Sequence, residues 1–175
     1  MPGTKQRTMN DLQMSAPEKR EYDIHPEGPY MAVCRDIWTE TVDNPKAGQM
    51  NQWGNVEKDK ITYIHFEFLT EEAIEINGQL KPRFIKRRFN LGWSEKSGCR
   101  AFVRMWDPKT GKDDHADLNT LVGRGAFLNI SHNVNGDKTF ANIETIATPP
   151  KGSTIPMIPP DFIRKNGEHA NDLPF

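Results

Sequence analysis

Basic residues surround Phe84 between positions 81 and 89 (KPRFIKRRF), and this segment contains no acidic residue. Cations attract phosphate groups and flat apolar rings stack on bases, so a strand that interleaves the two suits single-stranded nucleic acid. The residues expected to contact it are Arg83, Phe84, Lys86 and Arg88. A solvated strand with one aromatic residue in the core explains this segment alone equally well.

A second group of candidate residues surrounds Trp53 in the polar stretch 42–59 (VDNPKAGQMNQWGNVEKD). This stretch of about 18 residues is long for a loop in a compact domain, which indicates a functional or mobile segment. Trp53 either packs onto the domain as a plug or stacks on bases. Further candidate contacts with nucleic acid are Lys46, Lys58, Lys60, Tyr63, His65 and Phe140, of which Phe140 suits the core equally well.

Other chemistry is less well supported by the sequence. Residues of the types that bind metal ions occur together at Asp113, Asp114, His115 and Asp117. Acidic residues at the start of a short helix also complement its dipole and cap its free amides, which is the interpretation we adopt. A calcium loop in 133–144 is rejected because Lys138 stands where that loop needs glycine. We therefore expect no catalytic residue, no metal, no cofactor and no enzymatic activity.

The elements that position these residues follow from alternation and turn residues. We predict strands over 28–38, 60–69, 83–91, 126–134 and 138–147, with hairpin turns at Asn77-Gly78 and Asn135-Gly136. Arg87 interrupts the apolar face of the third strand, which indicates a bulge or an edge. A helix capped by Ser94 has one apolar stripe, made of Cys99, Phe102, Val103 and Trp106. A second short helix is predicted over 114–122.

Three strands, a helix and two further strands are typical of a mainly β fold, the five-stranded oligonucleotide-binding (OB) barrel with a helix between strands 3 and 4. A small α+β sandwich is the competing topology. We predict a flexible N-terminal arm over 1–27, the OB domain over 28–148, and a disordered, proline-rich tail with a protein-interaction tip over 149–175.

Composition narrows the class of protein. The chain has 23 Lys and Arg against 24 Asp and Glu, so nucleic-acid binding requires local clustering of charge. The polar opening and the lack of a long apolar stretch predict a protein that is neither secreted nor bound to a membrane. Cys34 and Cys99 are the two cysteines, expected to be reduced and semi-buried, with no disulfide or zinc site.

The last residues resemble the C-terminal tip of bacterial single-stranded DNA-binding proteins, in which acidic residues precede a terminal Pro-Phe. The matching residues are Asp172, Leu173, Pro174 and Phe175. The ring of a terminal Phe can fill an apolar pocket, and the α-carboxylate of the same residue can pair with a basic residue. The resemblance implies that this tip recruits replication or recombination proteins of a phage or its host. The family tip usually carries several acidic residues, whereas this chain has only Glu168 and Asp172 near its tip, which implies weaker recruitment.

The domain itself resembles phage-encoded single-stranded DNA-binding proteins. The segments that carry the resemblance are IEINGQLKPRFIKRRFNLGWSEKSGCR, LNTLVGRGAFLNISHNVNGDKTFANIETI and PPKG. It implies an OB fold, a role in phage DNA replication and recombination, and a location in the host cytoplasm.

We therefore expect a protein that coats and protects single-stranded DNA without strong sequence preference and recruits partners through its tip. It is also a possible homo-oligomer. The alternatives are an OB-fold adaptor of a replication or recombination complex, and a metal nuclease.

Overall fold

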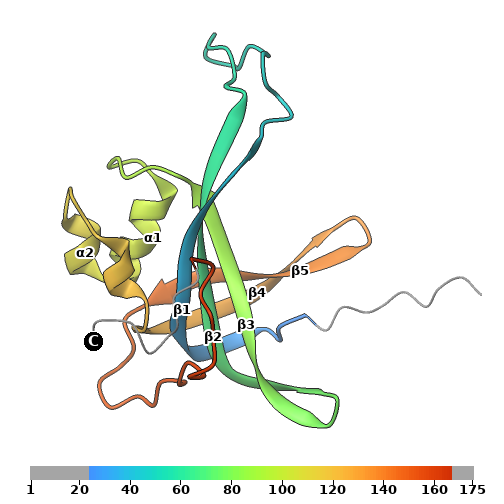
Figure 1. The fold of residues 1–175 in the computed structure, drawn as a ribbon, viewed down its shortest axis with the longest axis vertical. Helices are drawn as coiled ribbons and strands as arrows, with labels where there is room; N and C mark the ends of the chain where they lie inside the picture. The colour runs from blue at the N-terminus through green and yellow to red at the C-terminus, as the bar shows by residue number, and fades with distance from the viewer. Residues whose placement is uncertain (1–23, 167–175) are drawn as a thin grey trace, which may run out of the picture.

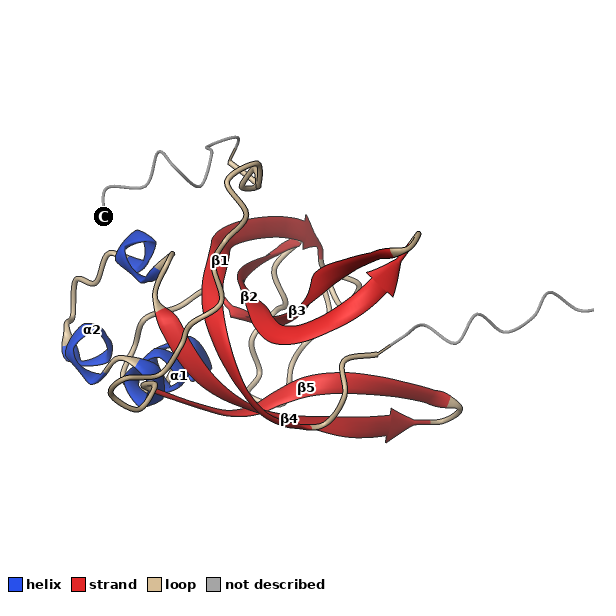
Figure 2. Cartoon of the chain, turned by 90° about the horizontal axis from the view of Figure 1, so that it is seen from below, coloured by secondary structure: helices blue, strands red, loops and turns tan. Residues whose placement is uncertain are grey.

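The computed structural model describes residues 24–166, which form one antiparallel sheet with the strand order β3-β2-β1-β4-β5. The strands are β1 (Gly28–Asp43), β2 (Lys60–Ile76), β3 (Gln79–Asn90), β4 (Gly125–Asn135) and β5 (Lys138–Ala147). The sheet curls into a half-barrel, and Figure 2 shows its curvature. The predicted mainly β class with five strands is confirmed. The first two strands continue well beyond their predicted ends.

Two tight turns set the register of the hairpins. Asn77 and Gly78 both have positive φ, 52° and 76°, as a type I′ turn requires. The second hairpin turns at Gly136 and Asp137, one residue later than predicted, because Asn135 still pairs with Lys138. Gly136 has a φ of 65° at the first turn position, which fits the type II′ turn.

Helices lie between β3 and β4: α1 (Gly98–Trp106), α2 (Pro108–Lys112) and the 3-10 helix η2 (Leu118–Leu121). The cap of α1 is Ser97 rather than Ser94, and its side chain accepts the Arg100 N–H. The predicted short helix over 114–122 is confirmed only as η2, which is followed by Gly123 with a φ of 88°, and residues 114–117 are not helical. Asp113 Oδ1 accepts the N–H of His115 at 2.9 Å, a local turn that competes with helix formation. No helix within residues 24–166 is long and apolar enough to cross a membrane.

The core lies between the inner face of the sheet and the apolar side of α1. The ring of Phe102 on α1 lies 5.4 Å from that of Phe66 on β2, and Trp106 lies 5.3 Å from Phe68. These four aromatic residues are buried, as are the inward-facing residues of β1, β4 and β5. Alternation along β2 therefore leaves Tyr63, His65 and Glu67 on its outer face.

A β-bulge in β1 reverses the alternation of that strand. The register with β2 shifts between Cys34 and Asp36, so that Arg35 is the extra residue. Cys34 pairs with Phe68 and Ile37 with Phe66, which places both on the inner face, while Asp36 lies opposite Glu67. The bulge consequently places Asp36 and Trp38 on the outer face, beside β2 and β3.

Both cysteines are fully buried free thiols, rather than semi-buried. Burial raises the pKa of Cys99 to about 11. The pKa of Cys34 is also raised, first by burial and then by the nearby carboxylate of Asp36.

Residues at both ends of the predicted domain pack against it. At the N-terminal side, His25 is buried and its Nε2 lies 2.6 Å from the hydroxyl oxygen of Thr70. At the C-terminal side, Arg164 is buried and forms an ion pair with Asp36 on β1. Residues on both sides of the predicted domain 28–148 therefore pack against it, which low apolar content does not reveal because single polar side chains make the contacts.

The C-terminal residues 162–166, here called the strap, cross the outer face of the sheet. In Figure 1 the strap is the dark red segment in front of β1 and β2. Val33 on β1 and Leu69 on β2 point to this outer face and are nevertheless buried. The outer face of the first three strands is therefore partly covered rather than fully open.

Candidate nucleic-acid interface

An aromatic pair stands at the centre of the outer face. Trp38 on β1 lies directly opposite His65 on β2, which in turn lies opposite Arg88 on β3. The rings of Trp38 and His65 are stacked, with 4.9 Å between centroids and 3° between planes. His65 Nε2 lies 2.9 Å from Glu40 Oε2, which holds the orientation of the imidazole. This pair is a partly buried aromatic surface, with the His65 side chain 12% exposed, of the kind on which a base stacks.

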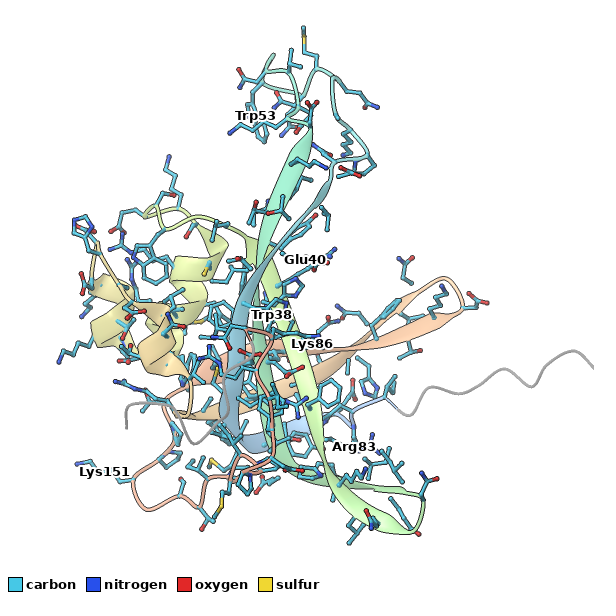
Figure 3. The ribbon with its side chains drawn as sticks, viewed as in Figure 1. Trp38, Glu40, Trp53, Arg83, Lys86 and Lys151 are labelled. Atoms are coloured by element: carbon cyan, nitrogen blue, oxygen red, sulfur yellow. The ribbon has the colours of Figure 1, made fainter. Side chains whose placement is uncertain are left out.

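Cations from different elements lie near the aromatic pair, and Figure 3 shows Lys86 close to Trp38. The ammonium group of Lys86 on β3 lies 5.8 Å from the centroid of the Trp38 ring, and that of Lys165 on the strap lies 5.7 Å from it. Arg88 lies over the ring of Tyr63, 4.4 Å from its centroid. Lys86, Arg88 and Lys165 are exposed, so they can meet phosphate groups beside the stacking surface.

A groove of about 790 Å³ runs beside these side chains. Its volume falls within the range of about 300–1,000 Å³ that is typical of pockets for small ligands. The sheet contributes Ile37, Trp38, Thr39, Glu40, Ile64, His65 and Lys86, η2 contributes Leu118 and Asn119, and the strap contributes Arg164, Lys165 and Asn166. The groove therefore brings together three segments that are distant in the sequence.

The predicted residues of β3 are divided between its two faces. Lys86 and Arg88 point outward, whereas Arg83 shares the opposite side of the strand with Ile85. Arg83 is half-buried, and its Nη1 lies 3.4 Å from the carbonyl oxygen of Ile24. Figure 3 shows Arg83 well apart from Trp38 and Lys86, so it does not belong to the groove.

Phe84 is on the outer face but is not a free stacking surface. Its ring is 48% exposed, and the guanidinium carbon of Arg35 lies 4.5 Å from its centroid. The same guanidinium lies 4.6 Å from the ring of Phe162 on the strap. Arg35 also donates from Nε to Glu67 Oε2 at 2.6 Å. The exposed ring of Phe84 therefore takes part in anchoring the strap.

Trp53 lies at the far end of the β1–β2 hairpin, away from Trp38 and Lys86 (Figure 3). It is 76% exposed, so the interpretation of Trp53 as a plug in the domain is wrong. Asn51 Oδ1 accepts the backbone N–H groups of Trp53 and Asn55, each at 3.0 Å. The loop is thus an ordered extension of the hairpin, and the structure does not bring Trp53 into the groove.

The remaining predicted residues lie around the groove rather than in it. Lys46 and Lys58 are exposed on the loop that carries Trp53, and Lys60 forms an ion pair with Asp43 at the base of that loop. Phe140 is 48% exposed on β5, in the hairpin that projects away from the first three strands (Figure 1). The loop lysines stand among the acidic residues Asp43, Glu57 and Asp59, whereas Phe140 lies on a separate projection.

The acidic residues that resemble a metal site have other partners. Asp114 Oδ1 accepts from buried Arg100 at 2.8 Å, and Asp117 Oδ1 caps η2 by accepting the Asn119 N–H at 3.0 Å. Within residues 24–166, no group of three or more His, Cys, Asp or Glu side chains is arranged to hold a metal ion.

Trp38 and Lys165 line the groove but are absent from the predicted site. Simple alternation from Cys34 places Trp38 on the inner face, because only the bulge at Arg35 reverses it. Lys165 falls in a segment predicted to be disordered. The predicted tip, residues 172–175, lies outside the described residues. No protein-family model and no curated protein matches the chain.

Proposed function

We propose that this protein binds single-stranded DNA, without enzymatic activity, in the groove beside Trp38 and His65. The observation that carries the proposal is the stacked pair itself, with the ammonium groups of Lys86 and Lys165 within 6 Å of the Trp38 ring. Stacking contributes about 1–3 kcal/mol per base and tolerates any base, while cations neutralise the phosphates. A surface that combines the two binds single strands better than duplexes, whose bases are already stacked.

The strand order supports an OB fold as the scaffold. In the sheet β3-β2-β1-β4-β5, the first strand pairs with both the second and the fourth, and α1 connects the third to the fourth. OB folds bind oligonucleotides on the face of strands 2 and 3 and with the loop between strands 1 and 2. The groove and the loop around Trp53 occupy those two positions here.

The role proposed for the protein is to coat and protect single-stranded DNA during phage DNA replication and recombination in the host cytoplasm. Stacking and phosphate contacts do not involve the hydrogen-bonding edges of the bases, which supports binding without strong sequence preference. The resemblance of residues 172–175 to the tip of bacterial single-stranded DNA-binding proteins supports recruitment of replication or recombination proteins through that tip.

Binding to an oligothymidylate at several salt concentrations tests the proposal. Three phosphates held by Lys86, Arg88 and Lys165 give a slope of log affinity against log salt of about −2, at about −0.7 per phosphate. If Lys46 and Lys58 also take part, the slope is about −3.5. Fluorescence anisotropy of a labelled strand measures the affinity, and a duplex of the same length is the control. Salt-independent binding, or equal affinity for the duplex, would refute this mechanism.

A protein-interaction adaptor is the second candidate function. Met50, Trp53 and Val56 are 72%, 76% and 64% exposed at the tip of the β1–β2 hairpin, which is an unusual concentration of apolar surface. A partner protein with an apolar recess would bury these side chains. Absence of oligothymidylate binding at low salt would favour the adaptor, and metal-dependent cleavage of the strand would instead indicate a nuclease.

A further inference from the structure

We propose that the strap is a wall of the DNA site, in which Lys165 contacts a backbone phosphate and the Asp36–Arg164 ion pair holds Lys165 in position. This inference rests on the proposed binding of single-stranded DNA to the groove. It assigns a role in binding to residues 162–166, which the sequence places in a tail remote from the barrel.

The ion pair between the strap and β1 is almost completely shielded from water. Arg164 Nε donates to Asp36 Oδ1 at 3.0 Å, and the two side chains are 2% and 1% exposed. The other carboxylate oxygen of Asp36 accepts the backbone N–H of Lys165 at 2.8 Å. Both oxygens of one carboxylate therefore bind consecutive residues of the strap, which fixes the direction of the chain at Lys165.

Holding the strap by a buried ion pair costs free energy, because both charges lose their hydration. Apolar side chains would attach the segment at lower cost but would leave its register free to slide. In this protein each oxygen of the Asp36 carboxylate has its own partner on the strap, so the two contacts together specify one arrangement. Here the arrangement that they specify places the ammonium group of Lys165 5.7 Å from the Trp38 ring centroid.

The strap has a second anchor on its other side. Arg35 lies between the rings of Phe84 on β3 and Phe162 on the strap, at 4.5 Å and 4.6 Å from their centroids. Glu67 on β2 fixes the guanidinium of Arg35 through a 2.6 Å ion pair. With both anchors in place, Lys165 lines the groove from the strap while Lys86 lines it from β3. A strand bound on Trp38 would thus meet cations from two elements.

Substitution of the exposed lysine tests the first part of the inference. Lys165→Ala should reduce the magnitude of the salt slope for oligothymidylate by about 0.7, the contribution of one phosphate, and lower the affinity several-fold at low salt. Lys151→Ala is the matched control, since Lys151 is exposed on the same C-terminal segment but lies far from Trp38 (Figure 3). This control should retain both the slope and the affinity of the wild type.

A double-substitution cycle tests the positioning role of Arg164. Arg164→Met should reduce the salt slope as Lys165→Ala does, although Arg164 is too deeply buried to contact a phosphate itself. Added to Lys165→Ala, it should cause no further loss of affinity per folded molecule, with the folded fraction measured by circular dichroism. A role limited to stability would leave the slope of the folded protein unchanged and would refute the positioning role.

The outcomes separate the two proposals. If the wild-type protein does not bind oligothymidylate, the proposed function fails and the role of the strap fails with it. If the wild type binds and Lys165→Ala keeps the full slope, the strap is not part of the site, whereas the proposed function stands. Lys165 is exposed, so its substitution tests the inference even if Arg164→Met fails to fold.

Discussion

The guanidinium of Arg87 on β3 donates a hydrogen bond to the main-chain carbonyl of Ile143 on β5, and so joins the two strands at opposite ends of the sheet order. The same guanidinium lies over the rings of Phe89 and Phe102, 5.1 Å and 5.7 Å from their centroids. The charge that interrupts the apolar face of β3 therefore points inward, where it bridges the open side of the half-barrel.

Replacing Arg87 should consequently destabilise the fold. Arg87→Met keeps the apolar stem but leaves the Ile143 carbonyl without this donor, and an unsatisfied buried group costs about 1–3 kcal/mol. Urea denaturation followed by circular dichroism measures the free energy of unfolding. The matched control is Arg88→Met, one residue along the strand, whose side chain is exposed on the outer face. Equal stability of the two variants would show that the bridge to β5 contributes nothing.

Arg87 shows which structural features the sequence predicts and which it does not. Of the two alternatives expected at Arg87, an edge or a bulge, the edge is confirmed, since β3 is the end of the sheet. The register with β2 is continuous there and shifts only between Leu69 and Ala73. In the sequence, an inward-facing arginine is seen only as a break in the apolar pattern of its strand. Its acceptor lies on a strand 56 residues away, so neighbouring residues do not reveal it.

Local signals did predict the local structure. Asn77 and Gly78 marked their turn, and the apolar stripe of α1 was identified at its actual spacing, since both depend on neighbouring residues alone. The groove required non-local information. Trp38 reaches it through a bulge, and Lys165 reaches it through an ion pair that spans 128 residues of sequence. The basic residues of β3 were found, but their division between two faces followed only from the observed register.

Trp53 should contribute to DNA binding without contributing to stability. It is 76% exposed, so Trp53→Ala removes little buried surface and should leave the free energy of unfolding unchanged. If the loop folds over a bound strand, the loss of stacking should cost about 1–3 kcal/mol of binding free energy. Anisotropy titration with oligothymidylate measures this change, and Trp53→Phe, which keeps a ring, should recover most of it.

One result of this titration would contradict a role of Trp53 in DNA binding. Full affinity in Trp53→Ala would confine DNA to the groove and leave the apolar hairpin tip to another partner. That result would agree with a salt slope of about −2 rather than about −3.5, because Lys46 and Lys58 lie on the same loop.

His25 should make stability depend on pH. Burial lowers the pKa of His25 below its ordinary value of 6.5. Its Nδ1 lies 2.9 Å from the Pro26 carbonyl oxygen and therefore carries the proton, so the unprotonated Nε2 of the neutral ring accepts from Thr70. The unfolded chain binds a proton at higher pH than the folded one does. The stability from neutral His25 is thus present above pH 6.5 and is lost as the pH falls through the lowered pKa.

Urea denaturation between pH 8 and pH 5 measures this effect. His25→Gln should show a weaker decrease of the free energy of unfolding below about pH 6.5 than the wild type does. His115→Gln is the control, since His115 is exposed, and it should follow the wild-type curve. An unchanged pH profile in His25→Gln would mean that the buried imidazole does not control the acid sensitivity of the fold.

Two truncations should separate the strap from the tip. Deletion of residues 168–175 leaves the Asp36–Arg164 ion pair intact, so folding should not change. Because it removes the acidic side chains of Glu168 and Asp172, DNA affinity should stay the same or rise slightly. Deletion of residues 162–175 instead removes both strap partners of Asp36 and lets water reach its carboxylate, so it should lower the unfolding free energy by less than the roughly 3–5 kcal/mol of a charge left buried and unpaired.

The shorter truncation also tests the recruitment of partners. A tethered binding segment raises the local concentration of a partner near DNA, so loss of the tip should abolish capture of purified replication or recombination proteins by the DNA-bound protein. Phe175→Ala should reduce capture nearly as much, since it removes the ring that would fill an apolar pocket. Capture by the protein lacking 168–175 at the level of the full chain would move recruitment to the barrel, where the exposed Met50, Trp53 and Val56 are the surface to test next.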